Sequence, residues 1–207
     1  MRAELGAAVV GSVLLAATPG AHGIERIGFT FDEAPSTIGG FGGSGAAQTF
    51  RVAEGGTLKS LEFWMWSVVP PRDPPPAFDL EIYHWNGTDI GAEIWSARVD
   101  SLPILAQGTT ATQQNTSTLL STGMVDIPAG DFLIWWHVTG SGFSAPLIRY
   151  SPANAYADGR ALTRGSGSWV SLGSVNNDLA FIVEVVPAPS GAAVLGMGAL
   201  AALRRRR

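Results

Sequence analysis

The chain has 207 residues, no cysteine and a formal net charge of −4 at pH 7. The lack of cysteine excludes disulfide bonds and thiol chemistry, so a stable fold must rest on an ordinary hydrophobic core. Residues 24–186 contain eight basic and sixteen acidic side chains, which argues against nucleic acid as a partner because phosphate binding needs a basic face.

The N-terminal segment predicts a secretory signal helix over residues 1–23. A positive charge near the start precedes an apolar run over 5–17, and the small residues Ala21 and Gly23 follow. This order of parts is typical of an export signal and places cleavage before Ile24. The alternatives are a buried first helix and an uncleaved membrane anchor.

The segment between residues 24 and 186 predicts one all-β domain. Short alternating segments end repeatedly in Gly, Pro, Asn or Asp, and no long amphipathic helix pattern interrupts them. The proline-rich stretch 70–76 predicts an exposed loop, and Asn86-Gly87 predicts a tight hairpin turn. The expected strands are 48–52, 58–68, 78–85, 93–99, 116–125, 132–139, 147–150 and 179–186. They predict a single jelly-roll-like β-sandwich of eight or nine strands in two sheets.

Large aromatic side chains alternate with aliphatic ones along these strands, so the two kinds face opposite ways. A candidate ligand platform consists of Trp64, Trp66, Tyr83, Trp85 and Trp135, with Glu62, Glu81 and His137 at its border. Aromatic rings stack on sugar faces while carboxylates accept hydrogen bonds from hydroxyl groups, so the platform predicts binding of an exopolysaccharide. The alternative is that these rings pack inside the domain, because large aromatics dominate β-sandwich cores.

Catalytic motifs are missing from the sequence, which contains no His-Glu-x-x-His pair and no Gly-x-Ser-x-Gly elbow. A glycosidase needs two carboxylates about 5 to 10 Å apart. Glu62 and Glu81 are a candidate pair for the alternative function, a secreted polysaccharide hydrolase or lyase. We expect a protein that is not an enzyme and holds no cofactor.

Two polar clusters carry oxygen atoms of the kind that calcium prefers. They are Asn176-Asn177-Asp178 and Asp158-Gly159. The sequence has no Asp-x-Asp-x-Asp-Gly loop, and capping of turns accounts for the same residues. We therefore predict no metal site.

Residues 187–207 combine a turn motif, an uncharged apolar segment and a basic end. The prolines of Pro187-Ala188-Pro189 lack N–H donors and end the preceding strand. As a helix rising ~1.5 Å per residue, the apolar segment would span roughly 20 Å of a ~30 Å hydrocarbon core, and local thinning with arginine snorkelling would close part of the gap. The alternative is a terminal helix packed on the domain. A cytoplasmic C-terminus follows from the final residues Arg204, Arg205, Arg206 and Arg207.

This order of parts resembles the PEP-CTERM sorting tail of Gram-negative bacteria, which a membrane protease called exosortase recognises. Pro187 and Pro189 match the Pro-Glu-Pro motif of that family, and Ala188 departs from it. The resemblance implies an exported protein that is held transiently at the inner membrane and has an exosortase-like protease as a partner. Its destination would be the cell envelope or the extracellular matrix.

The body resembles the choice-of-anchor β-sandwich domains that often precede bacterial sorting tails. Five short strand or turn phrases carry the likeness: Ala47-Gln48-Thr49-Phe50, Thr57-Leu58-Lys59-Ser60-Leu61, Trp85-Asn86-Gly87-Thr88, Ile127-Pro128-Ala129-Gly130 and Asp178-Leu179-Ala180-Phe181. The resemblance implies a fold and a surface location, and no ligand. The expected organisation is a signal peptide over 1–23, a β-sandwich over 24–186 and a sorting signal over 187–207.

Overall fold

The computed structural model describes residues 23–30, 36–38, 45–66, 77–100, 116–138, 147–165, 167–173 and 177–188. Residues Gly23–Ala188 form one compact unit. The expected signal helix, the apolar tail segment, the terminal arginines and the proline-rich stretch 70–76 lie outside the described residues. In the described parts of the chain, no helix is long and apolar enough to span a membrane.

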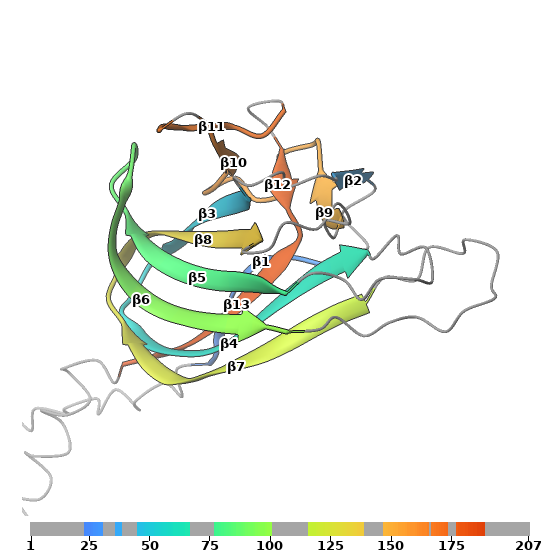
Figure 1. Cartoon of the computed structure of the whole chain (residues 1–207). Helices are drawn as coiled ribbons and strands as arrows, with labels where there is room; N and C mark the ends of the chain where they lie inside the picture. Colours follow the sequence, from blue (N-terminus) through green and yellow to red (C-terminus); the bar gives the residue numbers. More distant parts are fainter. Residues whose placement is uncertain are drawn as a thin grey trace, which may run out of the picture. The chain divides into compact units, whose positions relative to one another are not determined.

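The described secondary structure consists of β-strands paired in antiparallel sheets, which confirms the all-β prediction (Figure 1). One sheet has seven strands: β1 (Glu25–Phe29), β2 (Ser36–Ile38), β4 (Gly56–Trp66), β7 (Thr116–Ile127), β9 (Leu147–Ser151), β12 (Asp178–Leu179) and β13 (Phe181–Pro187). Its main path runs β1-β13-β4-β9-β12, while β2 pairs with β9 and β7 pairs with β4.

The second sheet has six strands in the order β11-β10-β3-β8-β5-β6. Their bounds are Trp169–Ser171 for β11, Ala161–Arg164 for β10, Ala46–Val52 for β3, Gly130–Val138 for β8, Phe78–Trp85 for β5 and Ile90–Val99 for β6. The described residues thus form thirteen strands where the sequence predicted eight or nine. The additional strands, such as β2, β11 and β12, have only two to five residues each, too few to show an alternation.

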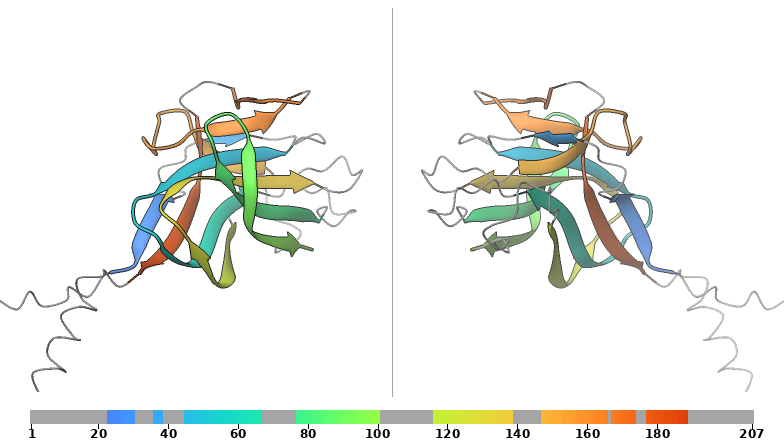
Figure 2. Two further views of the ribbon diagram at one scale, coloured as in Figure 1. Left: turned by 90° about the vertical axis from the view of Figure 1, so that its left-hand side faces the viewer. Right: turned by 90° about the vertical axis from the view of Figure 1, so that its right-hand side faces the viewer.

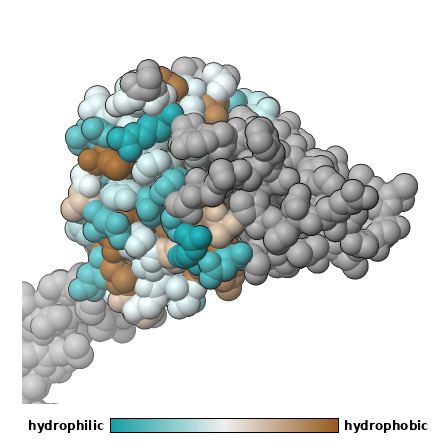
Figure 3. Space-filling model, viewed as in Figure 1, coloured by the Kyte–Doolittle hydropathy of each residue, from teal (hydrophilic) through white to brown (hydrophobic). Residues whose placement is uncertain are grey.

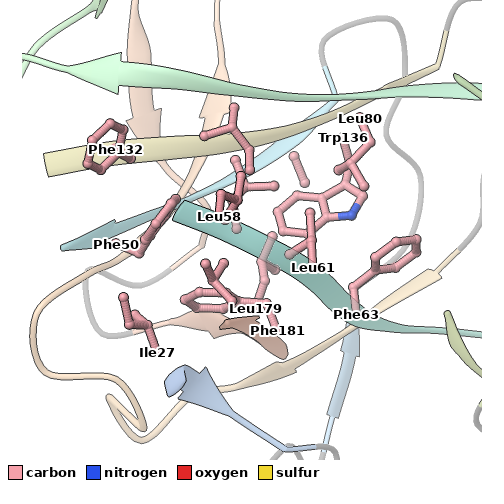
Figure 4. Packing of buried hydrophobic residues seen from close by; sticks show 14 of the residues in the cluster. Ile27, Phe50, Leu58, Leu61, Phe63, Leu80, Phe132, Trp136, Leu179 and Phe181 are labelled. Atoms are coloured by element: carbon pink, nitrogen blue, oxygen red, sulfur yellow. The ribbon is translucent and has the colours of Figure 1, made fainter. Parts of the chain in front are cut away.

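The two sheets pack face to face around a hydrophobic core, as Figure 4 shows for side chains that point inward from both. Phe63 of the seven-stranded sheet meets Trp136 of the six-stranded sheet with ring centroids 6.2 Å apart and planes at 74°. Phe50 and Phe181 meet across the same space at 6.1 Å. Full burial of one such ring contributes about 1.5 to 3 kcal/mol, so these aromatic contacts hold the layers together.

The hairpin predicted at Asn86-Gly87 is confirmed, because β5 and β6 pair directly on either side of it. The side-chain oxygen of Asn86 accepts hydrogen bonds from the backbone N–H groups of Thr88 at 2.9 Å and Asp89 at 2.7 Å. Gly87 has a φ of +97°, a conformation that costs glycine little. The returning strand begins at Ile90, slightly earlier than predicted.

The two ends of the described body lie side by side. Strands β1 and β13 pair along their length, with Glu25 opposite Val185 and Phe29 opposite Phe181 (Figure 2). A segment before β1 and a segment after β13 therefore join the body at neighbouring points of one sheet.

Candidate functional site

The five residues of the predicted aromatic platform do not share one face. Trp64 and Trp66 belong to β4 in the seven-stranded sheet, whereas Tyr83, Trp85 and Trp135 belong to β5 and β8 in the six-stranded sheet. The prediction that Trp64, Trp66 and Trp85 lie on one sheet face is therefore wrong. Trp64 packs against Phe29 and Ala180 instead, and the side chain of Trp66 lies outside the described residues.

The carboxylates of the candidate glycosidase pair are also separated. Glu62 lies between the buried residues Leu61 and Phe63 of the seven-stranded sheet. Glu81 lies between the buried Leu80 and Ile82 of the six-stranded sheet. Because successive side chains point to opposite faces of a strand, each glutamate points away from the core on its own sheet. The two carboxylates therefore do not flank a common bond.

Three indoles meet on the outer face of the six-stranded sheet, and we call Trp85, Trp135 and Trp169 the outer aromatic cluster. Trp169 of β11 stands edge-on to Trp85, with centroids 6.1 Å apart and planes at 89°. It meets Trp135 in the same manner at 5.3 Å and 79°. All three rings are half-buried, and they cover the buried residues Ala47, Leu133 and Leu162. Edge-to-face contacts of this kind stabilise by about 0.5 to 1.5 kcal/mol beyond the area they bury.

The strand register gives the places of these residues in the sheet. Ala47 of β3 is the direct partner of Trp135 on one side and of Leu162 on the other. Arg164, two residues further along β10, pairs with Trp169 of β11. Trp169 stands on β11, which β10 and β3 separate from β8 in the sheet order, so the register alone does not bring its ring to Trp135.

An arginine and a histidine frame the outer aromatic cluster. The guanidinium carbon of Arg164 lies 5.5 Å from the ring centroid of Trp135 and 5.7 Å from that of Trp169, within the range of a cation–π attraction. The imidazole ring of His137 stacks on the indole ring of Trp135, with ring centroids 4.5 Å apart and an interplanar angle of 21°. The indole nitrogen of Trp169 is buried without a hydrogen-bond partner among the described residues.

Glu81 and Tyr83 continue this face along β5. The Tyr83 hydroxyl donates a hydrogen bond to Oε2 of Glu81 at 3.1 Å, and Nδ1 of His137 lies 3.7 Å from the same oxygen. Burial, together with the negative charges of Glu81 and Glu93, raises the pKa of Tyr83 to about 12. The phenol is therefore a neutral donor, and Glu81 is an acceptor, beside the aromatic rings.

An open depression of about 380 Å³ adjoins the cluster at Trp85. Its lining includes Thr49, Arg51, Trp85, Asp131, Asp158 and Arg160. Arg51 of β3 pairs with Asp131 of β8 in the strand register, and their side chains form an exposed ion pair at 3.9 Å. The lining thus combines acidic and basic residues with one indole.

No protein family matches the chain, and no curated protein is similar to it in sequence. The function must therefore be argued from the site itself.

A buried polar network holds the loop of residues 152–160, which forms one side of the depression. The carboxylate of Asp178 accepts hydrogen bonds from Nε2 of Gln48 at 2.9 Å and from the backbone N–H of Tyr156 at 3.1 Å. The Gln48 side-chain oxygen in turn accepts from the N–H of Leu179 at 2.7 Å. Burial raises the pKa of Asp178 despite these two donors. Since Gln48 and Asp178 belong to different sheets, the network ties the two layers and the loop together.

The backbone of this loop also lies close to strand β3. Arg160 exchanges hydrogen bonds with Thr49, accepting from its backbone N–H at 3.1 Å and donating to its Oγ1 at 2.9 Å. The Tyr156 hydroxyl accepts from the N–H of Arg51 at 3.0 Å. At Gly159 a Cβ atom would collide with the carbonyl oxygen of Thr49, so glycine is required for the loop to lie this close to β3.

Of the two polar clusters with calcium-type oxygens, Asp178 is engaged within the domain, whereas Oδ1 of Asn177 is buried without a hydrogen-bond partner among the described residues. Both carboxylate oxygens of Asp178 accept hydrogen bonds within the network, and Nδ2 of Asn177 donates to the carbonyl of Leu172 at 2.7 Å. Asp158 lines the depression, and Asn176 lies outside the described residues. Where the structure describes the chain, no three acidic or histidine side chains gather as a metal site.

The first part of the predicted sorting motif is held in the sheet. Pro187 is the last residue of β13 and lies opposite Gly56, and the N–H of Ala188 donates to the carbonyl of Gly55 at 3.0 Å. Pro189 and Arg204 to Arg207 lie outside the described residues.

Two residues of the site were missed by the sequence analysis, namely Trp169 and Arg164. Trp169 stands in a strand of three residues, and Arg164 ends a strand of four. The only local signal in the sequence was a tryptophan within the Gly- and Ser-rich stretch 165–174. Such a stretch predicts a loop, and a large aromatic side chain in a loop indicates a contact with a distant part of the chain.

Proposed function

We propose that this chain is an exported, non-enzymatic β-sandwich protein of the cell envelope or extracellular matrix, and that it binds exopolysaccharide through the outer face of its six-stranded sheet. In this proposal the body is jelly-roll-like, a signal helix precedes it, and a PEP-CTERM-like tail with a short membrane helix follows. An exosortase-like protease acts on that tail, and the membrane contact is transient.

The observation that carries the binding proposal is the outer aromatic cluster. Trp85, Trp135 and Trp169 come from three strands of one rigid sheet and remain half-exposed on its outward side. Rigid aromatic surface of this kind suits the apolar faces of sugar rings. Glu81 and Tyr83 add a hydrogen-bond acceptor and a donor next to the rings.

The described surface visible in Figure 3 fits a protein with a localised binding face. On the face seen in Figure 3, hydrophobic residues lie in small separate groups among hydrophilic ones. Large continuous apolar patches mark protein or membrane interfaces, and the described part of this face does not display one. This pattern favours recognition of a hydrated ligand such as a polysaccharide.

The order of the segments along the sequence supports the proposed export and sorting. A predicted export signal comes first, the acidic body follows, and the apolar segment with its arginine block comes last. The pairing of Glu25 with Val185 brings the chain before β1 and the chain after β13 to neighbouring points of one sheet. Removal of residues 1–23 or of residues 189–207 would leave the paired strands β1 and β13 intact.

Fractionation of cells that express the tagged full chain tests the proposed export and sorting. We expect a processed form outside the cytoplasm, and release into the medium when residues 189–207 are deleted. Stable accumulation of an unprocessed cytoplasmic form would contradict the proposed export. Retention of the deleted form in the membrane fraction would show that the tail is not the anchor.

Retention on immobilised exopolysaccharide tests the binding face. Trp169→Ala should weaken retention, because it removes the ring that contacts both other indoles. Trp64→Ala is the matched control, since it removes an indole from the other sheet. Equal retention of the two variants would contradict the proposed binding face.

A further inference from the structure

We infer that the depression beside Trp85 is a subsite that holds one uncharged sugar ring and makes the protein select neutral over uronate-rich polysaccharides. The inference rests on the proposed function, which it deepens by naming the class of glycan.

Specific hydrogen bonds fix the loop that forms one side of the depression. Its loop is fixed by the N–H of Tyr156 bonding to the buried Asp178, and by the mutual hydrogen bonds between Thr49 and Arg160. Gly159 permits the close approach of this loop to β3. The volume of about 380 Å³ falls in the range of small-ligand sites.

The residues of the lining include both hydrogen-bond donors and acceptors. Asp131 and Asp158 carry carboxylates, which only accept hydrogen bonds, and Arg51 and Arg160 carry guanidinium groups, which only donate them. A sugar hydroxyl does both, so neighbouring hydroxyl groups can bridge a carboxylate and a guanidinium. The indole of Trp85 supplies an apolar surface for the ring itself.

The charges disfavour an acidic sugar. The two aspartates balance the two arginines, so the lining has no net positive charge that would bind a carboxylate. Arg51 is already paired with Asp131. Residues 24–186 also carry a formal charge near −8, which repels a polyanion during approach. A neutral polysaccharide meets neither obstacle.

The depression and the outer aromatic cluster form one continuous site. Trp85 lines the depression and also contacts Trp169 at 6.1 Å. A polysaccharide that lies along this face can therefore place one of its rings beside Trp85.

The test compares the full-length chain, purified in mild detergent, on neutral and acidic polysaccharides by affinity electrophoresis. Dextran, galactomannan and xyloglucan are the neutral probes, and alginate and polygalacturonate are the acidic ones. The informative variant is Asp158→Lys, which should fold because Asp158 is exposed. Its matched control is Asp126→Lys, which makes the same change of net charge at an exposed position of the other sheet.

We expect the wild-type protein to bind at least one neutral probe more tightly than either acidic probe. Asp158→Lys should weaken that neutral binding about tenfold, as expected for the loss of one hydrogen bond to a charged group, and should strengthen binding of the acidic probes. Asp126→Lys should leave the neutral binding unchanged.

Two results would overturn the inference while sparing the proposed function. They are tighter wild-type binding of an acidic probe, and equal effects of Asp158→Lys and Asp126→Lys. Failure of the wild-type chain to bind any probe would overturn the inference and the proposed binding function together.

Discussion

Replacement of Asp178 should reveal how the core network supports the candidate site. The Asp178 carboxylate accepts from Gln48 at 2.9 Å and from the Tyr156 N–H at 3.1 Å. Asp178→Ala removes both acceptors and leaves the Tyr156 N–H without its partner. Gln48 Nε2 retains a bond to the carbonyl of Thr49 at 3.1 Å. One unsatisfied buried group costs about 1 to 3 kcal/mol, so we expect Asp178→Ala to lower the free energy of unfolding by about 2 to 4 kcal/mol with the lost packing included.

The isosteric Asp178→Asn variant separates shape from charge. An amide can accept from one of the two donors but presents its own N–H₂ to the other, so a smaller loss of about 1 to 2 kcal/mol is expected. Because burial raises the pKa of Asp178, the folded protein binds this proton more tightly than the unfolded chain. The contribution of this proton to the free energy of unfolding is fully present below the ordinary pKa of aspartate. It is lost as the pH rises through the raised pKa of the folded protein. The advantage of the wild-type protein over Asp178→Asn should therefore shrink as the pH rises.

Urea unfolding at several pH values measures these differences. If the network is as described, both variants shift the midpoint while the dependence on urea stays the same. Asp178→Ala should in addition weaken neutral glycan binding, because the loop at Tyr156 loses its anchor. A variant as stable as the wild-type protein, or a gap that widens with rising pH, would refute the reasoning.

Three further outcomes follow from single contacts. Phe63→Ala empties a fully buried position between the sheets and should lower the free energy of unfolding by about 3 to 5 kcal/mol in the same urea assay; a loss below about 1 kcal/mol would contradict the packing. Gly159→Ala should push the loop away from Thr49 and weaken glycan binding, measured by affinity electrophoresis. Unchanged binding would contradict the claim that this loop forms part of the binding site. Glu81→Gln should lower the pKa of Tyr83 below its value of about 12, as followed by tyrosinate absorbance, because the negative charge of Glu81 is lost while burial, the larger cause of the shift, remains; an unchanged titration would argue against the contact.

Alternation along single strands could be predicted from the sequence. Leu80 and Ile82 are buried in the core and Glu81 between them points outward, as the pattern in β5 requires. The hairpin at Asn86 follows for the same reason, since its hydrogen bonds involve residues close in sequence. Local periodicity suffices wherever the deciding contacts are local.

The assignment of strands to sheets could not be predicted in this way. Alternation places both Trp64 and Trp85 away from the core, but it does not say which sheet each strand joins. Strand β4 pairs with β13, β7 and β9, whereas β5 pairs with β6 and β8. Most of these partners are distant in the chain, so the two indoles lie on different sheets although their strands are consecutive.

The depression escaped prediction for a related reason. It forms where the loop at Gly159 approaches Thr49 of β3, more than a hundred residues earlier in the chain. Trp169 likewise meets Trp85 and Trp135 only through the pairing of β10 and β11 with the rest of the sheet. The sequence contained the right residue types, but no local pattern brought them together.

The resonances of the indole N–H groups test the central claim most directly. The chain has seven tryptophans, and selective nitrogen-15 labelling with single substitutions would assign their signals. During titration of the full chain with a neutral oligosaccharide that it retains, the signals of Trp85, Trp135 and Trp169 should shift together while those of Trp64 and the buried Trp136 stay in place. Shifts at Trp64, or no shift in the outer aromatic cluster at saturation, would contradict the account.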